Sequence, residues 1–278
     1  MKEKPFIHCF RTYNCCYFYD FNTNAIVRIP ESVYVHLQHL EKGTANISEC
    51  DADVNEILNR LTEQGFLSSH HWCKIEHPAS RLLENYLEGS VQSLTLQVTQ
   101  QCNLKCEYCP YSGGFYNRQH NNRKMSFEIA KKAIDFYFLH SFDIPDAQIG
   151  FYGGEPLIEF EMIRRIVEYC NNEYYGKKIR YFVTTNATLL TEEKLDFLMK
   201  NNFVLTISLD GPRQYHNKNR HRVDDTGSFD IVMENIKMVY RKYHDKKENI
   251  QFNCVIDPEA DLKCINDFFI KEEALREY

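Results

Sequence analysis

The feature that most constrains the fold of this chain is a regular alternation of strand-like and helix-like segments, which begins at Leu94. Short stretches rich in β-branched and aromatic residues alternate with longer stretches whose apolar residues recur at helical spacing. This order predicts an α/β fold, with a parallel sheet or barrel and right-handed crossovers. The five strand-like segments are Leu94–Thr99, Ala147–Tyr152, Ile179–Thr185, Phe203–Leu209 and Ile250–Ile256.

Amphipathic helices are predicted between these strands. One of them carries Ile163, Ile166 and Cys170 on a single face, which is the spacing of a buried helical stripe. Ser126 and Thr191 precede two other helices and are predicted to cap them. A side-chain oxygen at that position accepts a hydrogen bond from an N–H group of the first helical turn.

Composition and charge narrow the class of protein. With 278 residues, 43% of them hydrophobic, the chain can bury the cores of one large and one small domain. The formal net charge of −6 provides no basic field for nucleic acid or an anionic membrane. The apolar runs are far shorter than the ~20 residues of a membrane helix. The stretch from Met1 to Phe10 is charged and mixed, unlike a signal peptide, so a cytoplasmic location is expected.

Residues 1–77 are predicted to form a small winged-helix-like α+β domain for peptide recognition. Two amphipathic helices follow the strands, and Phe66-Leu67 would begin a wing strand. The second helix carries three acidic residues and one arginine, which is a poor surface for phosphates, so nucleic acid is not an expected partner. Residues 78–93 have the character of a polar, partly helical linker, and 94–278 would form the main domain. The strand-like stretches lie near Ile7–Phe10, Cys16–Tyr19 and Ala25–Ile29.

Three of the eleven cysteines lie within eight residues, as Cys102, Cys106 and Cys109. A secreted, disulfide-stapled protein would explain a high count, but this chain is too large to need such staples and has no export signal. Three thiolates on one short loop can hold three irons of a [4Fe–4S] cluster and leave the fourth iron without a protein ligand. Zinc is the competing metal, with His120 as a conceivable fourth ligand.

Three more motifs follow the ends of later strands. Gly153-Gly154-Glu155-Pro156 follows the second strand, Thr184–Asn186 the third and Ser208–Pro212 the fourth. Active sites of parallel α/β folds gather at the carboxyl ends of the strands, so these segments are expected to meet the cysteine loop in space. The two glycines would let the backbone approach a ligand closely, and Glu155 could accept hydrogen bonds from an ammonium group.

The CxxxCxxC motif after a first strand, with an aromatic residue directly before the last cysteine, resembles the radical S-adenosylmethionine (SAM) superfamily. The resemblance implies a [4Fe–4S] cluster on Cys102, Cys106 and Cys109, whose open iron binds the amino and carboxylate groups of SAM. It also implies that an electron from the reduced cluster cleaves SAM to methionine and a 5′-deoxyadenosyl radical, which abstracts a hydrogen atom from a substrate. Tyr108 matches the position near the adenine.

The remaining motifs resemble segments of the peptide- and protein-modifying branch of that family. The segment Gly153–Pro156 matches the one that contacts the SAM amino group, and Ser208 matches a residue that contacts the ribose or carboxylate. Asn186 is expected to line the cavity. In the stretch His216–Phe229, Arg220 matches the arginine that reaches the SAM carboxylate, for which a guanidinium offers a planar donor fork.

Two residues depart from the pattern of that branch, since Ala187 and Asp225 stand where glycine is usual. The resemblance covers residues 90–270, and the family's barrel carries six βα units, of which five are visible here. A cysteine-rich C-terminal region is also missing. The expectation is therefore a C-terminally incomplete, partial (βα) radical SAM barrel, preceded by the winged-helix-like domain.

The function that the resemblance implies is maturation of a ribosomally made peptide, by forming a thioether or carbon–carbon crosslink. The small domain would bind the leader of the precursor peptide by strand addition to a sheet edge. A flavodoxin or ferredoxin is the expected electron donor, and neither nucleic acid nor a membrane is an expected partner.

Two alternatives to this function stay open. An anaerobic maturase that makes formylglycine in sulfatases shares the core motifs, although that branch usually starts almost directly with the cysteine motif. A truncated, catalytically silent peptide-binding module would keep the recognition domain without turnover. No catalytic acid or base can be assigned from the sequence.

Overall fold

A computed structural model describes residues 4–44, 50–112, 116, 119–276 and 278 of the chain. The chain divides into two compact units, Met1–Ser80 and Arg81–Tyr278. The boundary falls inside a short 3-10 helix, η1 (Pro78–Leu82), and helix α3 (Leu83–Gly89) follows it. Both elements lie in the segment 78–93 that was expected to be a partly helical linker.

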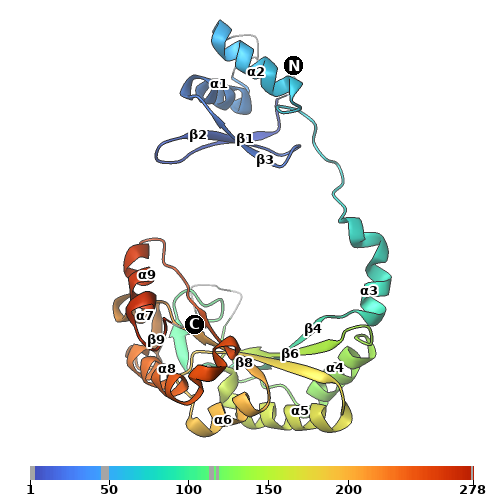
Figure 1. The fold of residues 1–278 in the computed structure, drawn as a ribbon, viewed down its shortest axis with the longest axis vertical. Coiled ribbons are helices and arrows are strands. Elements are labelled where there is room, and N and C mark those ends of the chain that lie inside the picture. Colours follow the sequence, from blue (N-terminus) through green and yellow to red (C-terminus); the bar gives the residue numbers. More distant parts are fainter. Residues whose placement is uncertain (1–3, 45–49, 113–115, 117–118, 277) are drawn as a thin grey trace. The chain divides into compact units, whose positions relative to one another are not determined.

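The first unit packs a three-stranded antiparallel sheet against two helices (Figure 1). The strand order β1-β2-β3 is a simple meander, with β2 in the centre. One apolar cluster, which includes Phe18, Leu37 and Leu58, joins the sheet to both helices. The elements are β1 (Ile7–Arg11), β2 (Cys16–Asp20), β3 (Ala25–Ile29), α1 (Glu31–Lys42) and α2 (Ala52–Glu63).

The prediction of a wing strand at Phe66-Leu67 is wrong, because neither residue is extended in a sheet. Leu67 has a φ of +63°, in the left-handed region, and its N–H donates to the buried Asp20 carboxylate at 2.8 Å. The same carboxylate accepts a hydrogen bond from the Thr23 N–H at 2.9 Å, so it closes the β2–β3 turn and holds the segment after α2. The winged-helix expectation for this unit is not confirmed.

The second unit is built on a parallel sheet of five strands, in the order β10-β8-β7-β6-β4. Each strand therefore pairs with the next sheet strand along the chain, as the βα alternation predicts. The predicted strands overlap the observed ones, but the fifth ends at Asn253 and not at Ile256. The strands are β4 (Ser93–Thr99), β6 (Asp146–Gly153), β7 (Lys178–Thr185), β8 (Phe203–Ser208) and β10 (Ile250–Asn253).

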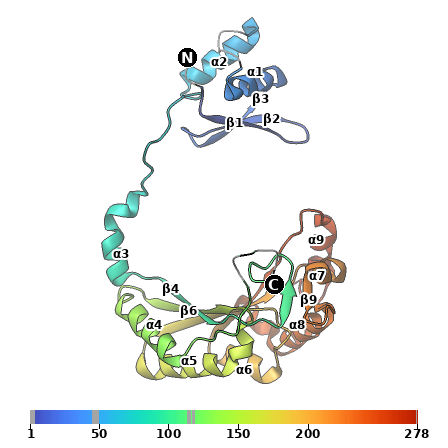
Figure 2. The same cartoon turned by 180° about the vertical axis from the view of Figure 1, so that it is seen from behind.

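Helices α4, α5 and α6 lie along one face of this sheet in both views (Figure 1 and Figure 2). The two predicted caps are confirmed, because Ser126 accepts from the Ile129 N–H at 3.3 Å and Thr191 from the Lys194 N–H at 3.3 Å. The helices of this part of the unit are α4 (Phe127–Leu139), α5 (Phe160–Glu173), α6 (Glu192–Lys200), α7 (Arg213–Asn219), α8 (Phe229–Tyr243) and α9 (Leu262–Lys271), with 3-10 turns η2 (Pro156–Glu159) and η3 (His244–Asn249).

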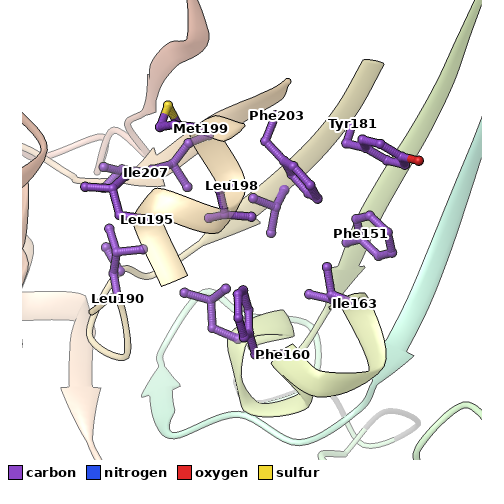
Figure 3. Packing of buried hydrophobic residues seen from close by; sticks show 14 of the residues in the cluster. Phe151, Phe160, Ile163, Tyr181, Leu190, Leu195, Leu198, Met199, Phe203 and Ile207 are labelled. Atoms are coloured by element: carbon purple, nitrogen blue, oxygen red, sulfur yellow. The ribbon is translucent and has the colours of Figure 1, made fainter. Parts of the chain in front are cut away.

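The core of the second unit lies between the sheet and these helices. Figure 3 shows Phe151 of β6, Tyr181 of β7 and Phe203 of β8 close to apolar residues of α5 and α6, including Ile163 and Leu198. All five side chains are almost fully buried. The parallel pairing of the strands that this layer covers brings their carboxyl ends to one edge of the sheet.

A small second sheet lies beyond that edge. Strand β5 (Leu104–Cys106) pairs antiparallel with β9 (Arg220–Arg222), with Cys106 opposite Arg220. The pairing joins the cysteine loop to a segment more than a hundred residues later in the chain. No local signal in the sequence predicts it.

Candidate functional site

A cavity of about 390 Å³ lies at the carboxyl edge of the parallel sheet. It collects residues from the cysteine loop and from the ends of β6, β7, β8 and β10. Ten of the eleven residues predicted for the site line it. Pro156 does not, because it is buried at the start of η2. The ten lining residues are Cys102, Cys106, Tyr108, Cys109, Gly153, Gly154, Glu155, Asn186, Ser208 and Arg220.

The three cysteines of the loop face this cavity as free thiols. The Cys109 N–H donates to the Cys106 carbonyl at 3.1 Å, which turns the loop so that both side chains share the cavity. Burial raises the pKa of Cys102 to about 12 and that of Cys106 to about 11, and the nearby Arg220 guanidinium opposes the rise at Cys106. The Cys102 and Cys106 thiols are therefore protonated at neutral pH, and a bound metal would displace their protons.

His120 also lines the cavity, but its ring makes a different bond. Its Nδ1 lies 3.0 Å from the Gln100 carbonyl oxygen, which can only accept, so Nδ1 carries the proton. Within the described ranges no three His, Cys, Asp or Glu side chains converge as ligands of a single metal ion.

Gly153, the last residue of β6, and Gly154, which follows it, both lie against protein backbone. A Cβ on Gly153 would overlap the Thr99 carbonyl oxygen, and a Cβ on Gly154 would overlap the Gln101 carbonyl group. The Gly154 N–H donates to Thr99 O at 3.0 Å and the Glu155 N–H to Gln101 O at 2.8 Å. The sequence predicted close approach of a ligand here, and the structure shows close approach of the backbone that leads into the cysteine loop.

Glu155 is 1% exposed and joins three segments through its carboxylate. One oxygen accepts from the Leu157 N–H at 3.0 Å and the Thr185 hydroxyl at 2.7 Å, and the other accepts from the Asn186 N–H at 2.8 Å. Burial raises the pKa of Glu155, and these three donors oppose the rise. The carboxylate thus connects the end of β6 to the end of β7.

Asn186 connects the end of β7 to the cysteine loop. Its Nδ2 donates to Asn103 Oδ1 at 3.0 Å, and Asn103 Nδ2 donates to the Thr188 hydroxyl at 2.7 Å. Ala187 has a φ of +58° and Asp225 a φ of +60°, so both residues that replace an expected glycine adopt the left-handed conformation that glycine favours. The backbone of both loops therefore keeps a shape typical of glycine despite the substitutions.

Asp210 is buried behind the cavity wall and holds two residues that line the cavity, Tyr108 and Arg220, a role that the sequence did not predict. It accepts from Arg220 Nε at 2.7 Å and Nη2 at 3.1 Å, from the Tyr108 hydroxyl at 2.6 Å and from the Val255 N–H at 3.0 Å. Burial raises the pKa of Tyr108, so its hydroxyl stays protonated and donates. The Ser208–Pro212 motif contained this signal, because it places an aspartate just after the end of β8, beside the residues that line the cavity.

The end of β10 adds cavity residues that the sequence did not predict. Asn253, Cys254 and Val255 line the cavity, and Asn253 is the register partner of Ser208 on β8. They were predicted to continue a strand to Ile256, so their place at the cavity rim was not expected. The early end of β10 exposes them there.

Among the helices of the described residues, none has both the length and the apolar character that are needed to span a bilayer.

Comparison with known proteins identifies relatives of this chain. The serine-type anaerobic sulfatase-maturating enzyme of Bacteroides thetaiotaomicron is 31% identical over 170 residues, which cover 60% of this chain and 37% of that protein. The radical SAM cyclopropyl synthase TigE of Paramaledivibacter caminithermalis is 28% identical over 254 residues, which cover 83% of this chain and 52% of that protein. The chain thus spans about half the length, or less, of these curated relatives.

A solved structure of native anSMEcpe with bound AdoMet (S-adenosylmethionine) and the Kp18Cys peptide superposes with a TM-score of 0.54. It is 26% identical, and the match covers 64% of this chain and 47% of that one. The likeness supports the fold of the second unit.

The family profile described as the radical SAM superfamily matches residues 96–268, more than half of the chain. Its cofactors are a [4Fe–4S] cluster and SAM, and the donor set fits the cluster, since three free thiols from one loop face a single cavity. The chain therefore belongs to the radical SAM superfamily.

Proposed function

We propose that this chain holds a [4Fe–4S] cluster on Cys102, Cys106 and Cys109, binds SAM beside it, and modifies side chains of a ribosomally made peptide. The observation that carries the proposal is the single cavity that the three thiols share with the ends of four parallel strands. When bound, the cluster and SAM supply a 5′-deoxyadenosyl radical that abstracts a hydrogen atom from the substrate.

The residues around the cavity suit the parts of SAM. Carbonyl groups of the Gly153–Glu155 segment would accept from the SAM ammonium, while the Glu155 carboxylate keeps that segment in place through its three bonds. Tyr108 would pack near the adenine. Ser208 and Asn186, which both line the cavity, would lie near the ribose of SAM.

Arg220 is the proposed partner of the SAM carboxylate. It is 7% exposed and lines the cavity, and its guanidinium lies over the Tyr108 ring at 5.4 Å. Two of its five N–H donors go to Asp210, which balances the buried charge and fixes the orientation of the fork. The other N–H groups give it the capacity to bind a second carboxylate.

A peptide is the proposed class of substrate, and a thioether or carbon–carbon crosslink the proposed product. The cyclopropyl synthase match covers 83% of the chain and therefore extends well beyond residues 96–268. A structural neighbour carries a bound peptide. In the first unit, β3 pairs only with β2 among the described strands, and its outer edge would take an extended leader peptide by strand addition.

The second candidate is formylglycine formation in a sulfatase. The 31% identity to a sulfatase-maturating enzyme over 170 residues favours it. A flavodoxin or ferredoxin is the proposed electron donor for either function.

Anaerobic reconstitution of the chain with iron and sulfide, followed by dithionite and SAM, tests the proposal. We expect a cluster absorption band and release of 5′-deoxyadenosine. Cys106→Ala should lose both, whereas Cys264→Ala, which changes a cysteine of α9 outside the cavity, should lose neither. Absence of the band and of 5′-deoxyadenosine in the unmutated chain would contradict the proposal.

The substrate is tested with the same reconstituted chain. Short peptides encoded beside its gene, and a sulfatase peptide with its target cysteine or serine, are incubated separately. Loss of two hydrogen atoms from a neighbouring precursor peptide, with a new crosslink in its fragmentation spectrum, supports peptide maturation. Formylglycine in the sulfatase peptide alone supports the second candidate.

A further inference from the structure

His216 lies in the middle of α7, is 0% exposed, and does not line the cavity. Both of its ring nitrogens make hydrogen bonds. Nδ1 lies 3.4 Å from the Asp210 amide nitrogen, and Nε2 lies 3.0 Å from the Ser228 hydroxyl. The Ser228 hydroxyl in turn lies 3.0 Å from the Arg220 carbonyl oxygen.

The direction of every hydrogen bond in this chain of contacts is determined by its two ends. The Asp210 amide can only donate, so Nδ1 accepts and carries no proton. The Arg220 carbonyl can only accept, so the Ser228 hydroxyl donates to it and must accept from Nε2–H. The imidazole is therefore neutral, with its proton on Nε2.

The hydrogen bonds of His216 and Ser228 thus run from the Asp210 amide to the Arg220 carbonyl. The side chains of these same two residues, Asp210 and Arg220, form a buried ion pair. The Asp210 carboxylate has two donors on each oxygen, namely Tyr108 and Arg220 Nε on one, and Val255 N–H and Arg220 Nη2 on the other. It has no acceptor position left for a ligand. Its role is to orient Tyr108 and Arg220, and its own backbone is held by the imidazole.

We infer that His216 is a positioning residue for SAM binding, which ties the backbone of Asp210 to that of Arg220 through Ser228 and so sets where Tyr108 and the guanidinium meet the ligand. The inference rests on the proposed function, because it takes SAM as the ligand of the cavity. A neutral ring is required, and burial of His216 lowers its pKa to about 4, so the ring is neutral at pH 7.

Four variants test this role in the anaerobically reconstituted chain. His216→Phe keeps a ring but removes both hydrogen bonds. His216→Asn keeps an acceptor for the Asp210 N–H but does not reach Ser228. Ser228→Ala removes only the bonds that the Ser228 hydroxyl makes to His216 and to the Arg220 carbonyl. Ser141→Ala is the control. Ser141 is also buried and bonded to backbone carbonyls, at the end of α4 and outside the cavity.

The measurements are iron content, the SAM dissociation constant by equilibrium dialysis, and the change in the cluster's electron paramagnetic resonance spectrum on adding SAM. We expect wild-type iron in all four, a dissociation constant raised tenfold or more in His216→Phe, and a smaller rise in His216→Asn and Ser228→Ala. Ser141→Ala should bind SAM within twofold of the unmutated chain. A His216→Phe chain that binds SAM within twofold of wild type overturns the inference.

Nitrogen NMR of the histidine rings in the full-length, cofactor-free chain at pH 7 gives a second readout. We expect a neutral His216 ring with the proton on Nε2. A proton on Nδ1, or a charged ring, overturns the inference even if the phenylalanine variant does not fold. An unmutated chain that shows this tautomer but binds no SAM contradicts the proposed function instead, so the two failures are distinguishable.

Discussion

Replacing Gly154 by alanine should damage the cluster site through the backbone alone. A Cβ at this position would overlap the Gln101 carbonyl carbon and oxygen and lie 3.0 Å from the Cys102 amide nitrogen. These atoms are main chain, so the segment that leads into Cys102 must move by on the order of 1 Å, and overpacking of this kind costs about 1–3 kcal/mol. Weakening of the Glu155 N–H bond to Gln101 O adds about 1 kcal/mol.

The total is about 2–4 kcal/mol, which corresponds to a fall in Tm of about 2–4 °C per kcal/mol for a unit of this size. Because the displaced segment carries Cys102, iron content after reconstitution should fall as well. Gly150→Ala, which lies in β6 four residues before Gly154, is the matched control. Its Cβ would lie 3.3 Å from the Thr95 hydroxyl, a side-chain atom that can shift. A Gly154→Ala chain with wild-type Tm and full iron content would refute the reasoning.

Three further predictions concern the same unit. Asp210→Asn leaves the Arg220 guanidinium buried without a counter-charge and should destabilise the fold by about 3–5 kcal/mol in urea unfolding. Asp230→Asn breaks an exposed pair with Arg213 and should leave the urea midpoint nearly unchanged. The pKa of His216 is about 4 in the folded chain and 6.5 in the unfolded chain. Keeping the ring neutral therefore has no cost above pH 6.5, but the free energy of unfolding falls as the pH drops from 6.5 toward 4, by about 3 kcal/mol in all. Urea midpoints of the cofactor-free chain between pH 7 and 5 should fall less steeply in His216→Asn, and an equal slope would contradict this assignment. Thr191→Ala removes the cap of α6 and should lower stability by about 1 kcal/mol, measured as Tm, and an unchanged Tm would show that the cap is not needed.

The elements of the second unit were predictable because their signals are local. Apolar periodicity and cap residues are properties of short segments. Ser126 and Thr191 cap helices as predicted, and each predicted strand overlaps an observed one, although β10 ends three residues early. The convergence of the motifs followed from one topological rule, since parallel strands end at the same edge. Ten site residues could thus be placed at one cavity without any knowledge of contacts.

The contacts that complete the site were not predictable in this way. The pairing of Cys106 with Arg220 and the four donors on Asp210 join segments that are distant in the sequence. In the first unit, the wing prediction for Phe66-Leu67 failed because a backbone bond to Asp20, 47 residues earlier, outweighs the local preference of two apolar residues. Why Gly153 and Gly154 must lack a Cβ also depends on long-range packing, because the atoms that a Cβ would meet belong to the backbone of residues 99–102.

The β5–β9 ribbon has a consequence for how the protein matures in the cell. Cys106 gains its partner strand only when the ribosome has made Arg222, about 10 seconds after Cys109 at typical synthesis rates. During that interval three thiols of one loop are on a nascent chain whose cavity has no far wall. The part of the cavity wall that Arg220 supplies is absent until then, so stable cluster insertion is expected only after β9 has been made and has paired with β5.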